Sequence, residues 1–211
     1  MGGRREGLGM IKTFRSPDSN YDFDTNNGNF VRWGKDYDDD PKLAPMPEIL
    51  DFEITEICAG PGGIPCPFCY KSNTPDKGKY TSFEVAKNVI DKMSFVTQIA
   101  FGVDAQCTSN PDTFKIMEYA RSKGIVPNVT VADISDDSAD KLVELCGAVA
   151  VSRYKDKSYC YNSIKKLTDR GMKQVNMHIM ISKETLPQVY ETIWDWLDCK
   201  NLEDVYHPLY N

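Results

Sequence analysis

The chain has 211 residues, of which 41% are hydrophobic, and its formal net charge is −6. This length and apolar content fit one sizeable domain with a real core and exclude the disordered class of proteins. The acidic balance argues against non-specific binding to nucleic acid, whose footprint is a basic surface.

The sequence also argues against a membrane protein and against a secreted protein. No segment approaches the run of about eighteen apolar residues that a membrane helix needs. The amino terminus carries charge but no apolar stretch, so we expect no secretory signal. Seven cysteines, an odd number without regular spacing, favour a reducing compartment over a disulfide scaffold. We therefore expect a cytoplasmic protein.

The first 48 residues are predicted to form a small region of their own. Residues 1–18 show no periodic pattern and are expected to include a flexible tail. Residues 21–34 alternate apolar and polar side chains around an Asn-Asn-Gly turn, which is typical of a β-hairpin. Residues 35–48 are acidic and rich in proline, so they are expected to be a connector.

From residue 49 to the carboxyl end, predicted strands alternate with predicted helices. The strands are expected at 49–55, 97–103, 126–133, 148–154 and 174–182, and the helices at 82–93, 110–124, 136–146, 161–171 and 186–197. Ser82, Asn110 and Ser135 are the predicted N-caps of the first three helices. This alternation implies right-handed βαβ crossovers, a parallel sheet and a second region spanning 49–211.

The stretch that follows the first of these strands, "ICAGPGGIPCPFCYKSNTP" (57–75), concentrates Cys58, Cys66 and Cys69 in twelve positions. It is not a glycine-rich phosphate loop, which weakens a dinucleotide-binding interpretation. Sites in parallel α/β proteins gather at the carboxyl ends of the strands, so the thiols lie where a catalytic site is expected.

Four kinds of chemistry are open to these thiols. Cys66 and Cys69 form a C-x-x-C pair, which can be a redox pair, although the residues after it do not read as a helix. Structural zinc usually takes four ligands, and no fourth is obvious. The thiols can also be incidental. Three thiolates in a tight Gly/Pro loop suit an iron–sulfur cluster with one iron left open, because thiolate is the ligand that such clusters use.

On these residues, the sequence from about 49 to 199 resembles the radical S-adenosylmethionine (SAM) superfamily. Within it, the chain is similar to short members of phage and metagenomic origin. The resemblance implies a partial parallel (βα) barrel in which Cys58, Cys66 and Cys69 hold a 4Fe–4S cluster whose open iron binds SAM. It also implies that an electron donor such as flavodoxin or ferredoxin reduces the cluster. SAM is then cleaved to methionine and a 5′-deoxyadenosyl radical, which abstracts hydrogen from a substrate that the sequence does not identify.

The resemblance further implies a set of SAM contacts, with two departures from the family pattern. Seven residues separate Cys58 from Cys66, where the family usually has three. The Gly-Gly-Glu that ends the second family strand is replaced here by Gly102-Val103-Asp104, whose carboxylate and backbone carbonyls would bind the SAM amino group. The remaining expected contacts are Phe68 beside the third cysteine, Ser152 and Arg153 at the end of the fourth strand, and Met180 against the adenine.

The carboxyl end shows a third departure. No sixth strand is recognisable in residues 199–211, so we expect about five βα units, an exposed sheet edge, and either an oligomer or marginal stability. Cys107 is expected to be a buried small apolar residue, and His178 either a barrel-interior histidine or a satisfied core histidine. The alternative function is a non-catalytic iron–sulfur or zinc protein built on a degenerate barrel.

Overall fold

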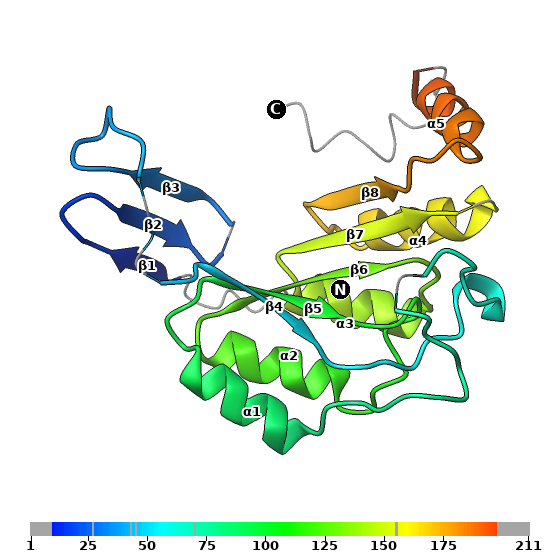
Figure 1. The fold of residues 1–211 in the computed structure, drawn as a ribbon, viewed down its shortest axis with the longest axis horizontal. Helices are drawn as coiled ribbons and strands as arrows, with labels where there is room; N and C mark the ends of the chain where they lie inside the picture. Colours follow the sequence, from blue (N-terminus) through cyan, green and yellow to red (C-terminus); the bar gives the residue numbers. More distant parts are fainter. Residues whose placement is uncertain are drawn as a thin grey trace.

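The structure is a computed structural model that describes residues 10–197, except for residues 27, 43, 45, 70 and 155. In this part of the chain the fold is α/β, with a five-stranded parallel sheet, five α-helices and a separate three-stranded antiparallel sheet (Figure 1). The strands of the parallel sheet are β4 (Ile49–Glu53), β5 (Gln98–Gly102), β6 (Val126–Val131), β7 (Ala148–Arg153) and β8 (Val175–Ile179). The helices are α1 (Phe83–Lys92), α2 (Thr113–Ser122), α3 (Asp136–Leu145), α4 (Lys157–Asp169) and α5 (Leu186–Leu197).

The parallel strands lie side by side in chain order, from β4 to β8. Each right-handed crossover therefore connects one strand to its neighbour in the same direction across the sheet. As a result, the crossover helices lie on the same face of the sheet. The buried core lies between that face and helices α1 to α4. Its main members are Ile90, Ile99, Phe101, Ile116, Met117, Val129, Val131, Leu142, Val149, Val151, Ile164 and Leu167. In the described part of the chain, these helices leave the other face of the sheet open.

Two of the three predicted N-caps are found at the starts of their helices. Ser82 and Ser135 are confirmed as N-caps, and their hydroxyls accept the amides of Val85 and Ser138. Asn110 is not the cap of α2, which begins at Thr113. The Asn110 amide instead donates to the carbonyls of Ile54 and Thr81, at 2.8 and 2.9 Å. These are contacts between distant segments that a local pattern does not contain.

Helix α4 begins four residues before the predicted position. Asp156 precedes it, and its carboxylate accepts the amide of Ser158 at 2.9 Å. The predicted start at residue 161 followed the apolar spacing alone, which misses this capped, polar first turn.

The expected hairpin is part of a larger element. Strands β2 (Asn20–Asp24) and β3 (Phe30–Trp33) pair antiparallel as predicted, but β1 (Ile11–Phe14) adds a third strand beside β2. Residues 11–14 are thus ordered, which corrects the expectation of a patternless tail up to residue 18. Four residues are too few for a periodic signal, and β1 is held by pairing and by Lys12, whose Nζ donates to the Val96 carbonyl at 2.8 Å.

The small sheet packs at the amino ends of the parallel strands. Its buried Tyr21 and Phe23 pack against Val126, the first residue of β6. Arg121 on α2 donates to the Thr25 carbonyl at 3.0 Å. The small sheet therefore covers the end of the parallel sheet that lies opposite the cysteine loop (Figure 1).

Candidate functional site at the carboxyl ends of the strands

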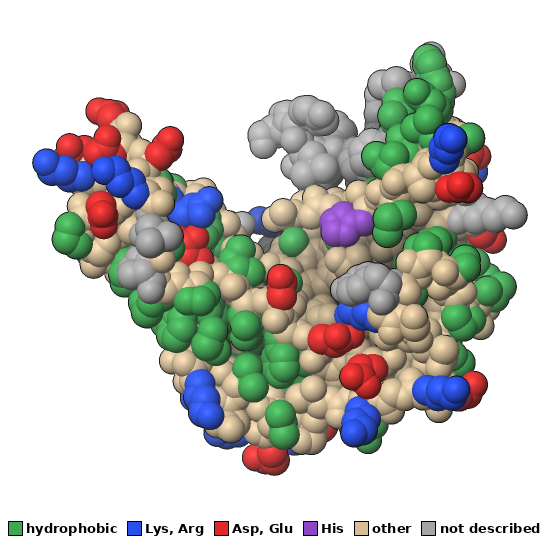
Figure 2. Space-filling view, in the orientation of Figure 1, with side chains coloured by type: hydrophobic (Ala, Val, Ile, Leu, Met, Phe, Trp, Pro, Cys, Tyr) green, Lys and Arg blue, Asp and Glu red, His purple; other side chains and the backbone are tan. Residues whose placement is uncertain are grey.

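A cavity of about 960 Å³ opens on the uncovered face of the parallel sheet. All five parallel strands contribute to it, together with the cysteine loop. In Figure 2 this hollowed face shows acidic side chains and a histidine among polar and backbone atoms. Because the loop follows β4 directly, its thiols lie at the carboxyl end of the sheet, as expected.

The cysteine loop is closed at its base by backbone pairing. Thr55 and Ile57 form isolated bridges with Tyr80 and Thr74, and the Cys58 amide donates to the Thr74 carbonyl at 3.2 Å. The segment that enters the loop (residues 55–58) and the segment that leaves it (residues 74–80) therefore lie side by side. The loop is a defined structural unit of the described chain.

The seven-residue segment between the first two cysteines is anchored to neighbouring strand ends. Gln106, which follows β5, donates to the Gly60 carbonyl at 2.8 Å, and Asp133, which follows β6, accepts the Gly62 amide at 3.0 Å. Gly60 has φ +75°, and a Cβ there would lie 1.9 Å from the Ile64 carbonyl oxygen. Glycine is therefore required at residue 60 for the turn that brings Cys66 back over the cavity.

The segment that follows Cys69 is attached to the sheet by an ion pair. Lys71 Nζ lies 2.5 Å from Glu53 Oε1, at the carboxyl end of β4. The turn between Cys66 and Cys69 is closed by a 3.1 Å hydrogen bond from the Cys69 amide to the Cys66 carbonyl. Glu53 and Lys71 were not among the predicted site residues.

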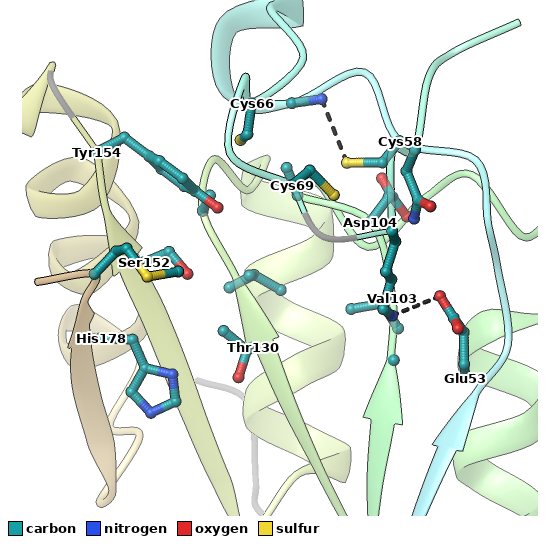
Figure 3. Close-up of a pocket in the computed structure, with 18 of the residues that line it drawn as sticks. Glu53, Cys58, Cys66, Cys69, Val103, Asp104, Thr130, Ser152, Tyr154 and His178 are labelled. Carbon is teal, nitrogen blue, oxygen red and sulfur yellow. Dashed lines mark hydrogen bonds and ion pairs between the residues drawn. The ribbon is translucent and has the colours of Figure 1, made fainter. Parts of the chain in front are cut away.

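The three predicted thiols all line the cavity and are half-buried. Cys58 Sγ accepts the Gly60 amide at 3.4 Å. Burial raises the pKa of the Cys66 thiol, the hydroxyl of Tyr154 acts in the opposite direction, and Cys58 and Cys69 raise it further. The three thiols thus lie within electrostatic reach of one another, facing a common space (Figure 3).

The thiols are not arranged around a single ion. Among the described residues, no three Cys, His, Asp or Glu side chains converge closely enough to hold one metal ion. The mononuclear zinc alternative therefore has no ready-made site in this part of the chain. Thiol donors around a shared space are chemically suited to a larger inorganic group with several metal atoms.

Asp104 lies beside the thiols, but most of its carboxylate is already occupied. The residue is 3% exposed, and Oδ1 accepts three hydrogen bonds of 2.9 Å from Thr108 and from the amide and hydroxyl of Ser109. Oδ2 accepts one bond of 3.2 Å, from the Gln106 amide. Oδ2 is thus the oxygen with remaining capacity to bind a ligand.

The backbone of Gly102-Val103-Asp104 is less available than predicted. The Gly102 carbonyl accepts the Ile54 amide at 2.9 Å, and the Asp104 carbonyl accepts the Cys107 amide at 3.1 Å. A Cβ at residue 102 would lie 2.9 Å from the Cα of Glu53, so close strand approach explains this glycine. Val103 is half-buried and lines the cavity.

Ser152 and Arg153 lie on opposite faces of β7, as successive strand residues do. Ser152 lines the cavity opposite His178 of β8, with which it is in register. The Arg153 side chain is 1% exposed and its Nη2 lies 3.0 Å from Glu191 Oε2 on α5. A ligand carboxylate would therefore compete with Glu191 for this guanidinium.

The remaining predicted contacts lie at the cavity rim. Phe68 is 47% exposed and its ring stacks on Tyr154, with centroids 5.7 Å apart. Met180, just after β8, is 55% exposed and also lines the cavity. Burial raises the pKa of Tyr154, which the sequence did not single out because no motif marks it. Cys107 is fully buried, as predicted. His178 is exposed and lines the cavity on the face of the sheet away from the helices, which fits the barrel-interior alternative of the prediction and not a buried core histidine.

Comparison with known proteins gives a distant likeness of fold and nothing finer. No family model and no curated protein matches the chain. Among solved structures, the fold is similar to the crystal structure of BtrN in complex with AdoMet and 2-DOIA, at 10% sequence identity and a TM-score of 0.45. The match covers 65% of this chain and 58% of that one. A likeness this distant carries no argument about function. Among the described residues, no helix is long and apolar enough to cross a membrane.

Proposed function

We propose that this protein is a radical SAM enzyme, built on a partial parallel barrel of that type. The observation that carries the proposal is that Cys58, Cys66 and Cys69 line one end of a cavity at the carboxyl ends of five parallel strands. In this proposal the three thiolates hold a 4Fe–4S cluster, and SAM and a substrate share the cavity below it.

The donor set fits such a cluster. Thiolate is the ligand type that iron–sulfur clusters use, and a cluster bound through several irons needs ligands that stand further apart than those of one ion. When bound, the cluster would supply the electron that cleaves SAM reductively. The Gly60 amide, which donates to Cys58 Sγ, would also stabilise that thiolate.

The chain's own residues would then orient SAM. In this proposal Asp104 Oδ2 would accept the SAM ammonium, and the Ser152 hydroxyl would hydrogen-bond its ribose. The stacked rings of Phe68 and Tyr154 would cover one side of the cofactor and exclude water from the cluster. Arg153 would bind the SAM carboxylate only by sharing its guanidinium with Glu191.

The test is anaerobic reconstitution with iron and sulfide. We expect about four irons and four sulfides per chain, in line with the cluster type, and a brown absorbance that disappears in a Cys58→Ala/Cys66→Ala/Cys69→Ala variant. Cys146→Ala, which changes a buried thiol of the helix-side core, is the matched control and should keep its iron. The loaded protein, reduced chemically or by flavodoxin, should produce 5′-deoxyadenosine from SAM.

Two outcomes would count against the proposal in different ways. One tightly bound zinc per chain without iron uptake would reject the cluster altogether. A full iron load with no 5′-deoxyadenosine would favour the non-catalytic iron–sulfur alternative.

A further inference from the structure

The floor of the cavity is made of small residues. Barrel interiors of this architecture are usually filled with bulky, branched side chains. Here Ala100, Gly102 and Ala150 occupy the open face of the central strands, together with Thr130. Strand register brings Asp51 opposite Ala100, and Thr130 opposite Ala150. The small side chains leave room above the sheet for a ligand.

The charged groups around this floor are mostly neutralised within the protein. Glu53 pairs with Lys71, and Arg153 pairs with Glu191. Asp51, two residues before Glu53 on the same face of β4, is different. It is exposed in the cavity, and among the described residues no Lys or Arg lies within 4.0 Å of its carboxylate. Asp51 is thus a carboxylate available to a ligand.

Among the described residues, the wall opposite β4 carries no acid, and Ser152 and His178 supply polar groups there beside apolar side chains such as Met177. His178 on β8 is exposed and stands in register with Ser152 on β7. Figure 3 shows Glu53 and His178 on opposite sides of the cavity with Thr130 between them, all on the amino-terminal side of the thiols along the strand direction. Imidazole and hydroxyl groups both donate and accept hydrogen bonds, so this wall suits oxygen or nitrogen functions of a ligand.

From this arrangement we infer that the floor binds a small polar substrate with a protonated amine. Asp51 is its counter-ion, and His178, Ser152 and Thr130 hydrogen-bond to its other polar groups. A phosphorylated substrate fits poorly because the Asp51 carboxylate would repel it, and a lipid would leave these polar groups unpaired. The inference rests on the proposed function, in that SAM takes the cysteine end of the cavity and leaves the floor to the substrate.

The experiment measures amine preference directly. A set of small primary amines, each matched with the alcohol that replaces its nitrogen by oxygen, is titrated against the protein by ligand-observed NMR. We expect amines to bind at least tenfold more tightly than their alcohols, and Asp51→Asn to weaken amine binding by about 10- to 100-fold, the range for losing a charge-assisted hydrogen bond. Asp76→Asn, in an exposed loop outside the cavity lining, should leave the preference unchanged.

The titrations are run on the protein as purified and again after cluster loading with SAM present, which separates the two proposals. Failure to take up iron, with the amine preference intact, would reject the radical SAM function alone. Equal binding of amines and alcohols in both states, or no binding, would overturn the inference, as would a preference that survives Asp51→Asn. The comparison of amines with alcohols on the unsubstituted protein stands even if the variant misfolds. A loss of SAM affinity in Asp51→Asn without a change in amine preference would likewise overturn it.

Discussion

At the scale of single residues, Asp104 has a structural role in a turn and a proposed role in binding SAM, and a sequence pattern cannot separate the two. Its Oδ1 accepts three hydrogen bonds from Thr108 and Ser109, and its Oδ2 accepts the Gln106 backbone amide, so the carboxylate holds the turn in which Cys107 has the left-handed value φ +65°. Non-glycine residues rarely adopt that conformation, so the turn depends on the carboxylate that organises it. Its Oδ2 accepts a single hydrogen bond, so Oδ2 is the oxygen that we assign to SAM in this proposal.

Substitution of Asp104 by asparagine separates these duties. Asparagine keeps an oxygen for the turn but removes the negative charge, so folding should be largely retained. Loss of a charge-assisted hydrogen bond to the SAM ammonium, worth about 1–3 kcal/mol, should weaken SAM binding about 5- to 150-fold. Calorimetric titration of the cluster-loaded protein measures this. Asp104→Ala should in addition lower the melting temperature, because it removes the acceptor of the turn. Unchanged SAM affinity in the asparagine variant would reject the assignment.

At the scale of elements, helix α5 is attached through its charged side. Glu191 binds Arg153 and Lys157, each at 3.0 Å, and Asp195 binds Lys157 and the Tyr161 hydroxyl, each at 2.8 Å. Four large apolar residues of α5 are instead exposed on another side, namely Leu186, Tyr190, Ile193 and Trp194, while Val189 is half-buried. The apolar spacing predicted the helix correctly but not which side of it contacts the protein.

We expect α5 to be the easiest helix to detach. Glu191→Gln combined with Asp195→Asn weakens its ion pairs, and about 1–2 kcal/mol of lost contact should raise local amide exchange by roughly 5- to 30-fold. Hydrogen exchange over residues 186–195 measures the effect, with α3 as an internal reference. Asp169→Asn, which removes an exposed ion pair with Lys165, is the control and should change nothing. Exchange in α5 that is unaffected by the double substitution would show that other contacts hold the helix.

At the scale of the whole molecule, the parallel sheet has one edge at β8. Within the described residues β8 pairs with β7 alone, and the segment in which we looked for a sixth strand, residues 199–211, lies outside them. An edge strand presents unpaired backbone groups that can recruit another chain. The exposed Met180 and Ile181 that follow β8 extend this edge with apolar surface.

We therefore propose that the 211-residue chain is oligomeric or marginally stable, and that its SAM cleavage is weak unless something covers β8. Amide exchange across Val175–Ile179, with light scattering on the same sample, tests this. Rapid exchange in a monomer, or protection only in an oligomer, is the expected result, and the central strand β6 should be protected in either state. A monodisperse monomer with strong protection of β8 and robust 5′-deoxyadenosine production would contradict it.

Local patterns were sufficient for the order of the parallel strands and their helices, for the caps Ser82 and Ser135, and for the gathering of three thiols after β4. Each depends on residues within a turn or two of one another, or on a spacing visible in "CPFC". The alternation in "ILDFE" also carried a signal that we did not use, since Asp51 and Glu53 share the face opposite Leu50 and Phe52.

Long-range contacts were needed for the rest. The pairing of β1, the Glu53–Lys71 ion pair and the turn of Arg153 toward Glu191 all join segments that a short window never sees together. The same holds for the cavity itself. Asp51 and His178 belong to the first and last parallel strands, and only the order and register of the strands between them bring one carboxylate and one imidazole to opposite walls of the same space.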